Sequence, residues 1–127
     1  MSQALMLLHE KLRKVMKFVG YEELTEVQEK AIPKVLSGRH TIIVAPTGSG
    51  KTEAALFPII SKMLSTNYQG RIAVIYVTPL RALNRDLMKR LSVICSNLEI
   101  DVAVRHGDTP QSRRRLIAEK PPHILIT

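Results

Sequence analysis

A short glycine-containing segment, lying between an apolar run and a helical pattern, limits the possible folds of this 127-residue chain more than any other feature. The segment reads APTGSGKT and covers residues 45–52. The apolar run at residues 41–45 predicts a buried strand, and apolar residues recur at helical spacing after Gly50. Glycines let successive backbone N–H groups turn toward one anion, and the N-terminal amides of a following helix point to the same place. The order of strand, loop and helix therefore predicts an α/β fold with an anion-binding loop.

The segment matches the phosphate-loop pattern, with Ala45 in place of the first glycine. In such loops the lysine, here Lys51, carries positive charge to the outer phosphates, and the hydroxyl of the next residue, here Thr52, ligates Mg²⁺. These two are the predicted catalytic residues, and Thr52 is the predicted metal ligand. The predicted phosphate-binding residues are Thr47, Gly48, Ser49, Gly50, Lys51 and Thr52. A plain Gly/Ser turn with an exposed lysine is disfavoured, because strand, loop and helix occur together in the required order.

The rest of the chain alternates between helical and strand-like patterns. Helices are predicted from Leu5 to Gly20, from Thr25 to about Leu36, after Gly50 with a bend at Pro58, from about Leu80 to Asn97, and after Pro110. Strands are predicted at residues 41–45, 72–78 and 101–105 and from about Ile124. This alternation predicts a parallel sheet covered by helices on both faces. No linker-like segment indicates a domain boundary, and the chain stops at a strand, for which truncation is the expected explanation.

Composition limits the partners and the compartment. Nineteen Lys and Arg against eleven Asp and Glu give a net charge of +8, which favours polyanions, nucleic acid ahead of a membrane surface. No apolar stretch is long enough to span a bilayer, and no secretory signal is present. A soluble, cytoplasmic chain without a membrane partner is expected. Cys95 lies among apolar residues, which predicts a buried, inert thiol, with a reactive thiol as the alternative.

Three further segments give the chain a family resemblance. The run GYEELTEVQ at residues 20–28 resembles the Q motif of superfamily 2 helicases of the DEAD/DEAH-box type. In that family the glutamine, here Gln28, reads adenine, and an amide suits this because it both donates and accepts hydrogen bonds. The resemblance therefore implies ATP as the nucleotide. The aromatic residue that stacks on adenine in many members has no counterpart near Lys11.

The second segment, TPLRAL at residues 78–83, resembles helicase motif Ia, which contacts the nucleic-acid backbone. Helix N-terminal amides together with Arg81 would form a phosphate site there. The third segment, HGDTPQSRRR at residues 106–115, resembles the loop that these helicases place against the bound strand, most closely in Lhr-like (large helicase-related) proteins. A helix cap at Asp108 or Thr109 and a solvated arginine face remain the alternative interpretation. The implied nucleic-acid contacts are Thr78, Pro79, Arg81, Gly107 and Arg113.

The resemblance implies that residues 1–127 form a partial N-terminal RecA-like domain, a three-layer P-loop NTPase fold with a parallel sheet. In the intact enzyme ATP hydrolysis would drive movement along single-stranded or duplex nucleic acid, with DNA favoured over RNA. The acidic motif that holds Mg²⁺ and the second RecA-like domain have no counterpart here, since Asp86, Asp101 and Asp108 are poorly placed. The chain alone is therefore expected to be inactive. A small-molecule kinase and a nonenzymatic basic nucleic-acid-binding module are the alternatives.

Overall fold

The computed structural model describes residues 2–127 and divides into two compact units, unit 1 (Met1–Asn67) and unit 2 (Tyr68–Thr127). The sequence contains no linker-like segment at this boundary and does not indicate the division. Within residues 2–127, no helix has both the length and the apolar character needed to cross a lipid bilayer.

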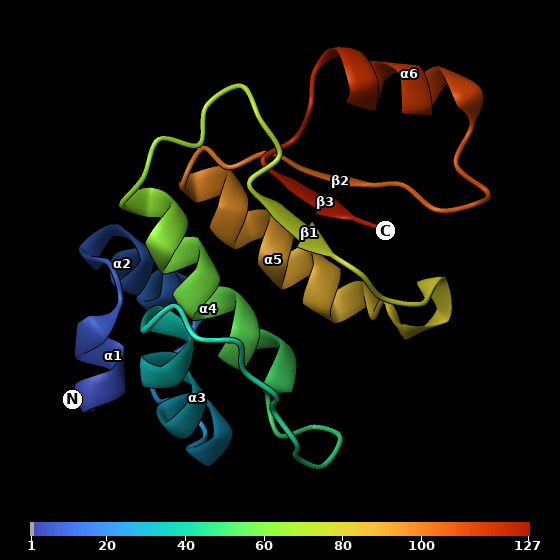
Figure 1. Ribbon diagram of the computed structural model, residues 1–127. Helices are drawn as coiled ribbons and strands as arrows, with labels where there is room; N and C mark the ends of the chain where they lie inside the picture. The colour runs from blue at the N-terminus through green and yellow to red at the C-terminus, as the bar shows by residue number, and fades with distance from the viewer. Residues whose placement is uncertain (1) are drawn as a thin grey trace. The chain divides into compact units, whose positions relative to one another are not determined.

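Unit 1 is built from helices. They are α1 (Gln3–Leu7), α2 (Glu10–Val19), α3 (Glu26–Leu36) and α4 (Lys51–Leu64), as Figure 1 shows. The helix α3 packs along α4, and α1 packs against α3. Their shared core consists of apolar side chains that are almost fully buried, among them Leu12, Met16, Ile32, Phe57 and Ile60.

The single helix predicted from Leu5 to Gly20 is wrong, because the chain breaks at Leu8 and His9. The N–H of His9 donates to Ser61 Oγ on α4 (2.8 Å), and His9 Nδ1 accepts from the N–H of Lys11 (3.1 Å). These contacts end one helix and cap the next. The predicted stop at Gly20 is confirmed, since its φ of 108° terminates α2 in a left-handed turn.

The predicted strand at residues 41–45 is also wrong. This segment has no regular secondary structure and pairs with no strand among residues 2–127. Ile42 and Val44 are each 91% exposed. An apolar run forms a stable strand only where a neighbouring strand takes up its backbone hydrogen bonds, and the described part of the chain supplies none.

Unit 2 contains a parallel sheet, as predicted. Its elements are β1 (Val74–Tyr76), a 3₁₀ turn η1 (Leu80–Ala82), α5 (Arg85–Asn97), β2 (Val102–Val104), α6 (Gln111–Glu119) and β3 (Ile124–Ile126). The strand β3 lies in the middle, and both β1 and β2 pair with it in parallel, with Val74 and Val102 opposite Ile124. The predicted strands 72–78 and 101–105 are too long by two residues and by one residue, respectively, at each end.

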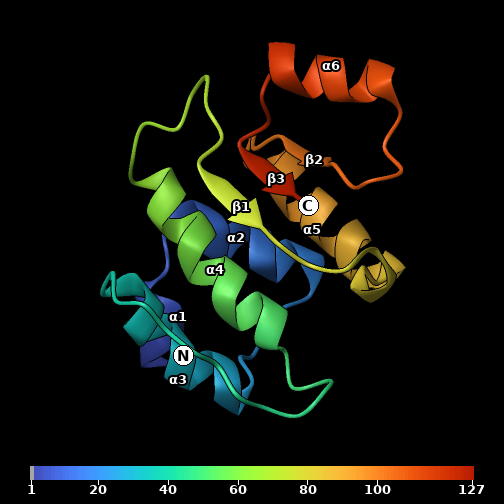
Figure 2. The ribbon, with the colours of Figure 1, turned by 45° about the vertical axis from the view of Figure 1, so that its right-hand side comes forward.

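The two connections of the sheet run in opposite directions, from β1 across to β2 and then back to β3. Right-handed crossovers in opposite directions place their helices on opposite faces. Figures 1 and 2 agree, since α5 and α6 lie on opposite sides of the three strands. The prediction that helices cover both faces is therefore confirmed for this sheet.

Burial differs between the strands. Ile124 and Ile126 of the central strand are completely buried, whereas Ile75 in β1 is 62% exposed and Val77 just beyond it is 78% exposed. The prediction of strands buried on both faces therefore holds for the central strand and is wrong for β1, which is an edge strand of this sheet.

His123 and Cys95 are both buried in unit 2. His123 is 6% exposed, its Nδ1 accepts from the N–H of Asp101 (2.9 Å), and its ring meets the edge of Tyr68. Cys95 is 1% exposed, and burial raises the pKa of its thiol to about 12. The predicted buried, inert thiol is thereby confirmed, because a thiol with this pKa carries almost no thiolate at neutral pH.

Candidate functional site

The glycine segment of unit 1 forms an open turn at the start of α4. Gly48 and Gly50 both have a φ of +83°, a left-handed conformation that other residues rarely adopt. The helix begins at Lys51, and no side chain caps it. Its first amides therefore point out of the helix end without a side-chain partner, which is the arrangement that binds an anion.

The polar side chains of this loop bond to its own backbone. Lys51 Nζ donates to the carbonyl of Ala45 (2.7 Å), and Ser49 Oγ donates to the carbonyl of Pro46 (2.6 Å). Lys51 and Thr47 are exposed, and Thr52 is half-buried in the first turn of α4. The ammonium group of Lys51 is thus bound to one neutral acceptor, the carbonyl of Ala45. An anion can replace this acceptor at little cost.

Gln28 lies against the same turn and is only 3% exposed. Its Oε1 accepts from the N–H of Thr25 (2.9 Å) and so completes a capping box at the start of α3. Its Nε2 donates to the carbonyl of Gly50 (3.3 Å). Each end of the amide is used once, which leaves one hydrogen and one lone pair. The predicted adenine-reading side chain is therefore also a brace between α3 and the loop.

A contact that sequence reasoning missed lies beside this brace. Tyr21 OH donates to Glu53 Oε2 (3.2 Å), and the Tyr21 ring meets Phe57 edge-on with centroids 5.1 Å apart. The tyrosine thereby connects the segment before α3 to the first turns of α4. No spacing rule reveals this pair, because the two residues are 32 positions apart.

In unit 2 the segment after β1 differs from its prediction. The helix expected from about Leu80 begins only at Arg85, because Asn84 Oδ1 accepts from the N–H groups of Asp86 (2.7 Å) and Leu87 (3.3 Å). Asn84 therefore already takes up two of the first helix amides, those of Asp86 and Leu87, with which the prediction had built a phosphate site. Arg81 lies in the 3₁₀ turn η1, exposed to solvent.

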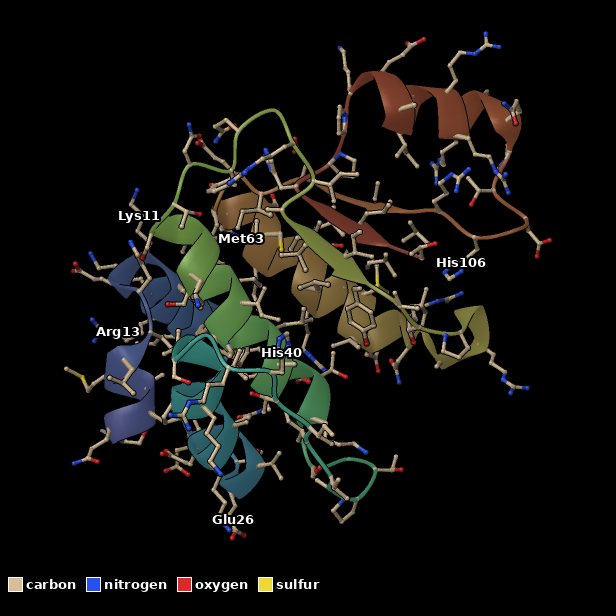
Figure 3. The ribbon with its side chains drawn as sticks, viewed as in Figure 1. Lys11, Arg13, Glu26, His40, Met63 and His106 are labelled. Atoms are coloured by element: carbon tan, nitrogen blue, oxygen red, sulfur yellow. The ribbon has the colours of Figure 1, made fainter. Side chains whose placement is uncertain are left out.

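The loop after β2 is closed by its own residues. The N–H of His106 donates to Thr109 Oγ1 (2.7 Å), and the N–H of Thr109 donates to the carbonyl of His106 (3.1 Å). The helix-cap alternative is wrong, because the N-cap of α6 is Pro110 and no side chain caps that helix. Figure 3 shows His106 in this loop.

These segments of unit 2 share one edge of the sheet. Thr78 and Pro79 follow β1, and Gly107 follows β2. Because parallel strands end at the same edge, η1 and the β2–α6 loop lie at one end of the sheet, as Figure 1 shows. Exposed arginines surround this edge: Arg81, Arg105 and Arg113. Asp108 is also exposed there, so the positive charge is not uniform.

No cluster of three or more His, Cys, Asp or Glu side chains suited to a metal ion occurs among residues 2–127. Within unit 1, Glu53 is the carboxylate next to Thr52 in sequence, and it bonds to Tyr21. A divalent cation at the loop would therefore be held by Thr52 and by the phosphates of the nucleotide, which is how such loops share Mg²⁺.

Comparison with known proteins identifies helicases that are similar to this chain in sequence and in structure. The ATP-dependent helicase Lhr-Core of Sulfolobus acidocaldarius is 37% identical over 119 residues, which cover 84% of this chain and 14% of that protein. The structure of Mycobacterium smegmatis helicase Lhr bound to ssDNA and AMP-PNP matches 99% of this chain and 17% of that one, with a TM-score of 0.79 and 34% identity.

A structure of the DEAD-box helicase Mss116 bound to ssRNA and UDP-BeF matches with a TM-score of 0.80 at 26% identity, over 94% of this chain and 26% of that one. The chain thus spans only about a seventh of the curated relative and has the fold of a RecA-like helicase core. Residues 25–127 match the DEAD/DEAH box helicase family, to which this chain therefore belongs.

Proposed function

We propose that this chain binds Mg-ATP at residues 45–52 as part of the first motor domain of an ATP-dependent helicase. One observation carries the proposal: Gly48 and Gly50 are both left-handed at the uncapped start of α4. This geometry leaves the first amides of α4 without a side-chain partner at the positive end of the helix, where they can donate to an anion. The family membership gives the loop its partner, a nucleoside triphosphate.

Each residue of the loop would then have its own role in binding the nucleotide. Lys51 Nζ leaves the carbonyl of Ala45 and meets the outer phosphates, a change of partner that requires only side-chain rotation. The N–H groups of Gly48, Gly50 and Lys51 would donate to the inner phosphate oxygens, and that of Ser49 would do so after leaving the carbonyl of Pro46. The hydroxyl of Thr52 holds Mg²⁺, which neutralises charge on the phosphates when it is bound.

Gln28 would discriminate the base. Its unused hydrogen and lone pair match the donor and acceptor on one edge of adenine, and guanine presents a different pattern. Because the side chain is 3% exposed, adenine reaches it only if the surrounding residues move aside. Nucleotide binding would then act directly on the brace between α3 and Gly50.

The carboxyl edge of the unit 2 sheet would contact nucleic acid. Thr78, Pro79, Arg81, Gly107 and Arg113 follow strands or lie on α6 near this edge. The net charge of +8 supports a polyanionic partner. The relative in the Lhr structure is bound to ssDNA, and we place single-stranded DNA ahead of RNA for this chain.

Thermal unfolding of the chain with and without Mg-ATP tests the nucleotide site. A ligand at about 100 times its dissociation constant stabilises the folded state by about 2.7 kcal/mol, so a clear rise in Tm is expected. Lys51→Ala should abolish that rise while leaving the Tm without ligand nearly unchanged, because Lys51 is exposed. Lys89→Ala on α5, another exposed lysine, is the matched control and should keep the full rise. An equal rise in Lys51→Ala would exclude this loop as the site.

Gln28→Glu separates base reading from helix capping. Glutamate at this position still accepts from the N–H of Thr25 and preserves the capping box. It removes the donor to Gly50 and to adenine. We expect the Tm without ligand to fall, because a buried carboxylate oxygen then faces the carbonyl of Gly50. We also expect this variant to lose the preference for ATP over GTP that we predict for the unaltered chain. An intact ATP preference in Gln28→Glu would show that another residue reads the base.

A further inference from the structure

One arginine of the RRR run differs from its neighbours. Arg114 Nη2 donates to the carbonyls of His106 (3.0 Å) and Gly107 (2.8 Å), and Arg114 Nε donates to the carbonyl of Thr109 (3.0 Å). Its side chain is half-buried, whereas Arg113 and Arg115 are exposed. The main chain of the β2–α6 loop is thus bound by a guanidinium group on the helix that follows it.

The geometry requires arginine. A planar guanidinium presents its N–H groups in a rigid fork and can satisfy three carbonyls at once, whereas a lysine ammonium on its flexible stem has no such fork. Successive residues on a helix point about 100° apart. The side chains of Arg113 and Arg115 are therefore directed away from the loop. The side chain of Arg114 folds back onto it.

We propose that Arg114 is a positioning residue for nucleic-acid binding: it holds the main chain of residues 106–109 in the shape that meets the strand, without contacting phosphate itself. The inference rests on the nucleic-acid half of the proposed function. Three of the N–H groups of Arg114 already have acceptors within unit 2. A loop ordered before binding does not have to be ordered by the strand, and this preorganisation increases affinity.

The charge of the run gives a direct test. Each phosphate contact contributes to the salt dependence of binding, about 0.7 in the slope of log K against log salt for a single strand. Arg113→Gln should lower the slope by about this amount, if Arg113 meets a phosphate as proposed. Arg114→Gln removes the same charge but should leave the slope unchanged and lower affinity about tenfold or more at every salt concentration, because the loop loses its order.

The experiment measures fluorescence anisotropy of a labelled single-stranded oligodeoxynucleotide with the whole chain over a series of KCl concentrations. Arg115→Gln is the matched control for net charge, since Arg115 is exposed and has no assigned contact. Amide hydrogen exchange of residues 106–109 provides the second readout. Exchange should accelerate in Arg114→Gln and stay unchanged in Arg113→Gln and Arg115→Gln. Arg114→Lys should behave like Arg114→Gln.

Thr109→Val keeps the inference testable if Arg114→Gln fails to fold. It loosens the same loop by removing the acceptor for the N–H of His106 and changes no charge. It should lower affinity at an unchanged salt slope. A lower slope in Arg114→Gln, equal to that in Arg113→Gln, would overturn the inference by showing a direct phosphate contact.

Unchanged affinity in Arg114→Gln, together with faster exchange of the loop, would overturn the inference alone and leave the interface standing. Absence of binding by the unaltered chain at low salt would overturn the proposed interface and this inference with it.

Discussion

Two loops of this chain lead into helices that lack a side-chain cap, yet the chain builds them in opposite ways. The loop before α4 has Gly50 at the N-cap, and the loop before α6 has Pro110 there. In the first, left-handed glycines keep the turn open. In the second, Arg114 and Thr109 occupy the inner carbonyl and N–H groups. The first loop leaves the amides at the start of α4 without a side-chain partner, and the second binds its main chain through its own side chains.

The difference shows what each loop presents to a partner. An open glycine turn offers main-chain amides, so its ligand must be an anion small enough to enter. A closed loop offers a fixed outer surface, and its ligand must be large enough to lie along that surface. We propose the phosphates of a nucleotide as the ligand of the first loop and the backbone of a nucleic-acid strand as the ligand of the second. Substitutions in the two loops should therefore impair different properties of the chain.

Gly50→Ala should have the largest effect. An alanine Cβ would lie 2.5 Å from Gln28 Nε2, and the φ of +83° disfavours any side chain. We expect a loss of about 1–3 kcal/mol in the free energy of unfolding and no rise in Tm with Mg-ATP. Denaturant unfolding and the ligand-dependent Tm measure both effects.

Gly48→Ala is the matched control for this change. Gly48 has the same φ of +83°, but a Cβ there meets nothing within 4 Å. Its free energy of unfolding should fall only by the cost of the left-handed backbone conformation for alanine, about 1 kcal/mol. Equal losses at Gly48 and Gly50 would mean that the contact with Gln28 contributes nothing.

Thr109→Val should have a smaller effect, confined to the closed loop. Valine has nearly the same shape but accepts no hydrogen bond, so the half-buried N–H of His106 loses its partner. We expect a loss of about 1 kcal/mol and faster exchange of the His106 amide, with Thr109→Ser behaving like the unaltered chain. If the stability of Thr109→Val matched that of Thr109→Ser, the bond from the N–H of His106 to Thr109 Oγ1 would contribute nothing to the stability of the loop.

The open loop was predictable from the sequence, and the closed loop was not, for a physical reason. A left-handed turn needs glycine at the positions that turn, so its location is written into neighbouring residues such as Gly48 and Gly50. The Thr25 cap and the Gly20 stop are local in the same sense, and the structure confirms both. Arg114 binds carbonyls of a loop that lies five to eight residues before it in the sequence. The RRR run itself does not show which of its three side chains turns inward.

The other failures have the same origin. A strand at residues 41–45 needs a partner strand, which residue patterns near Ile43 do not reveal. The helix after β1 begins late because Asn84 competes for the amides of Asp86 and Leu87, and an asparagine inside a helical pattern gives little warning of this. The family resemblance implied that Gln28 reads the base, but its bond to Gly50 depends on how α3 packs against α4.

Gly107→Ala should have the smallest effect on stability and tests whether the closed loop contacts the strand through its main chain. Gly107 is not left-handed, and a Cβ there meets nothing within 4 Å, so the change in unfolding free energy should stay within about 0.5 kcal/mol. The fold therefore does not require glycine at this position. If the strand backbone approaches the main chain there, the added methyl group should weaken binding of single-stranded DNA in the anisotropy measurement without changing the Tm. Unaltered affinity in Gly107→Ala would mean that this loop contacts the strand through side chains alone, and that its closed main chain serves only as their support.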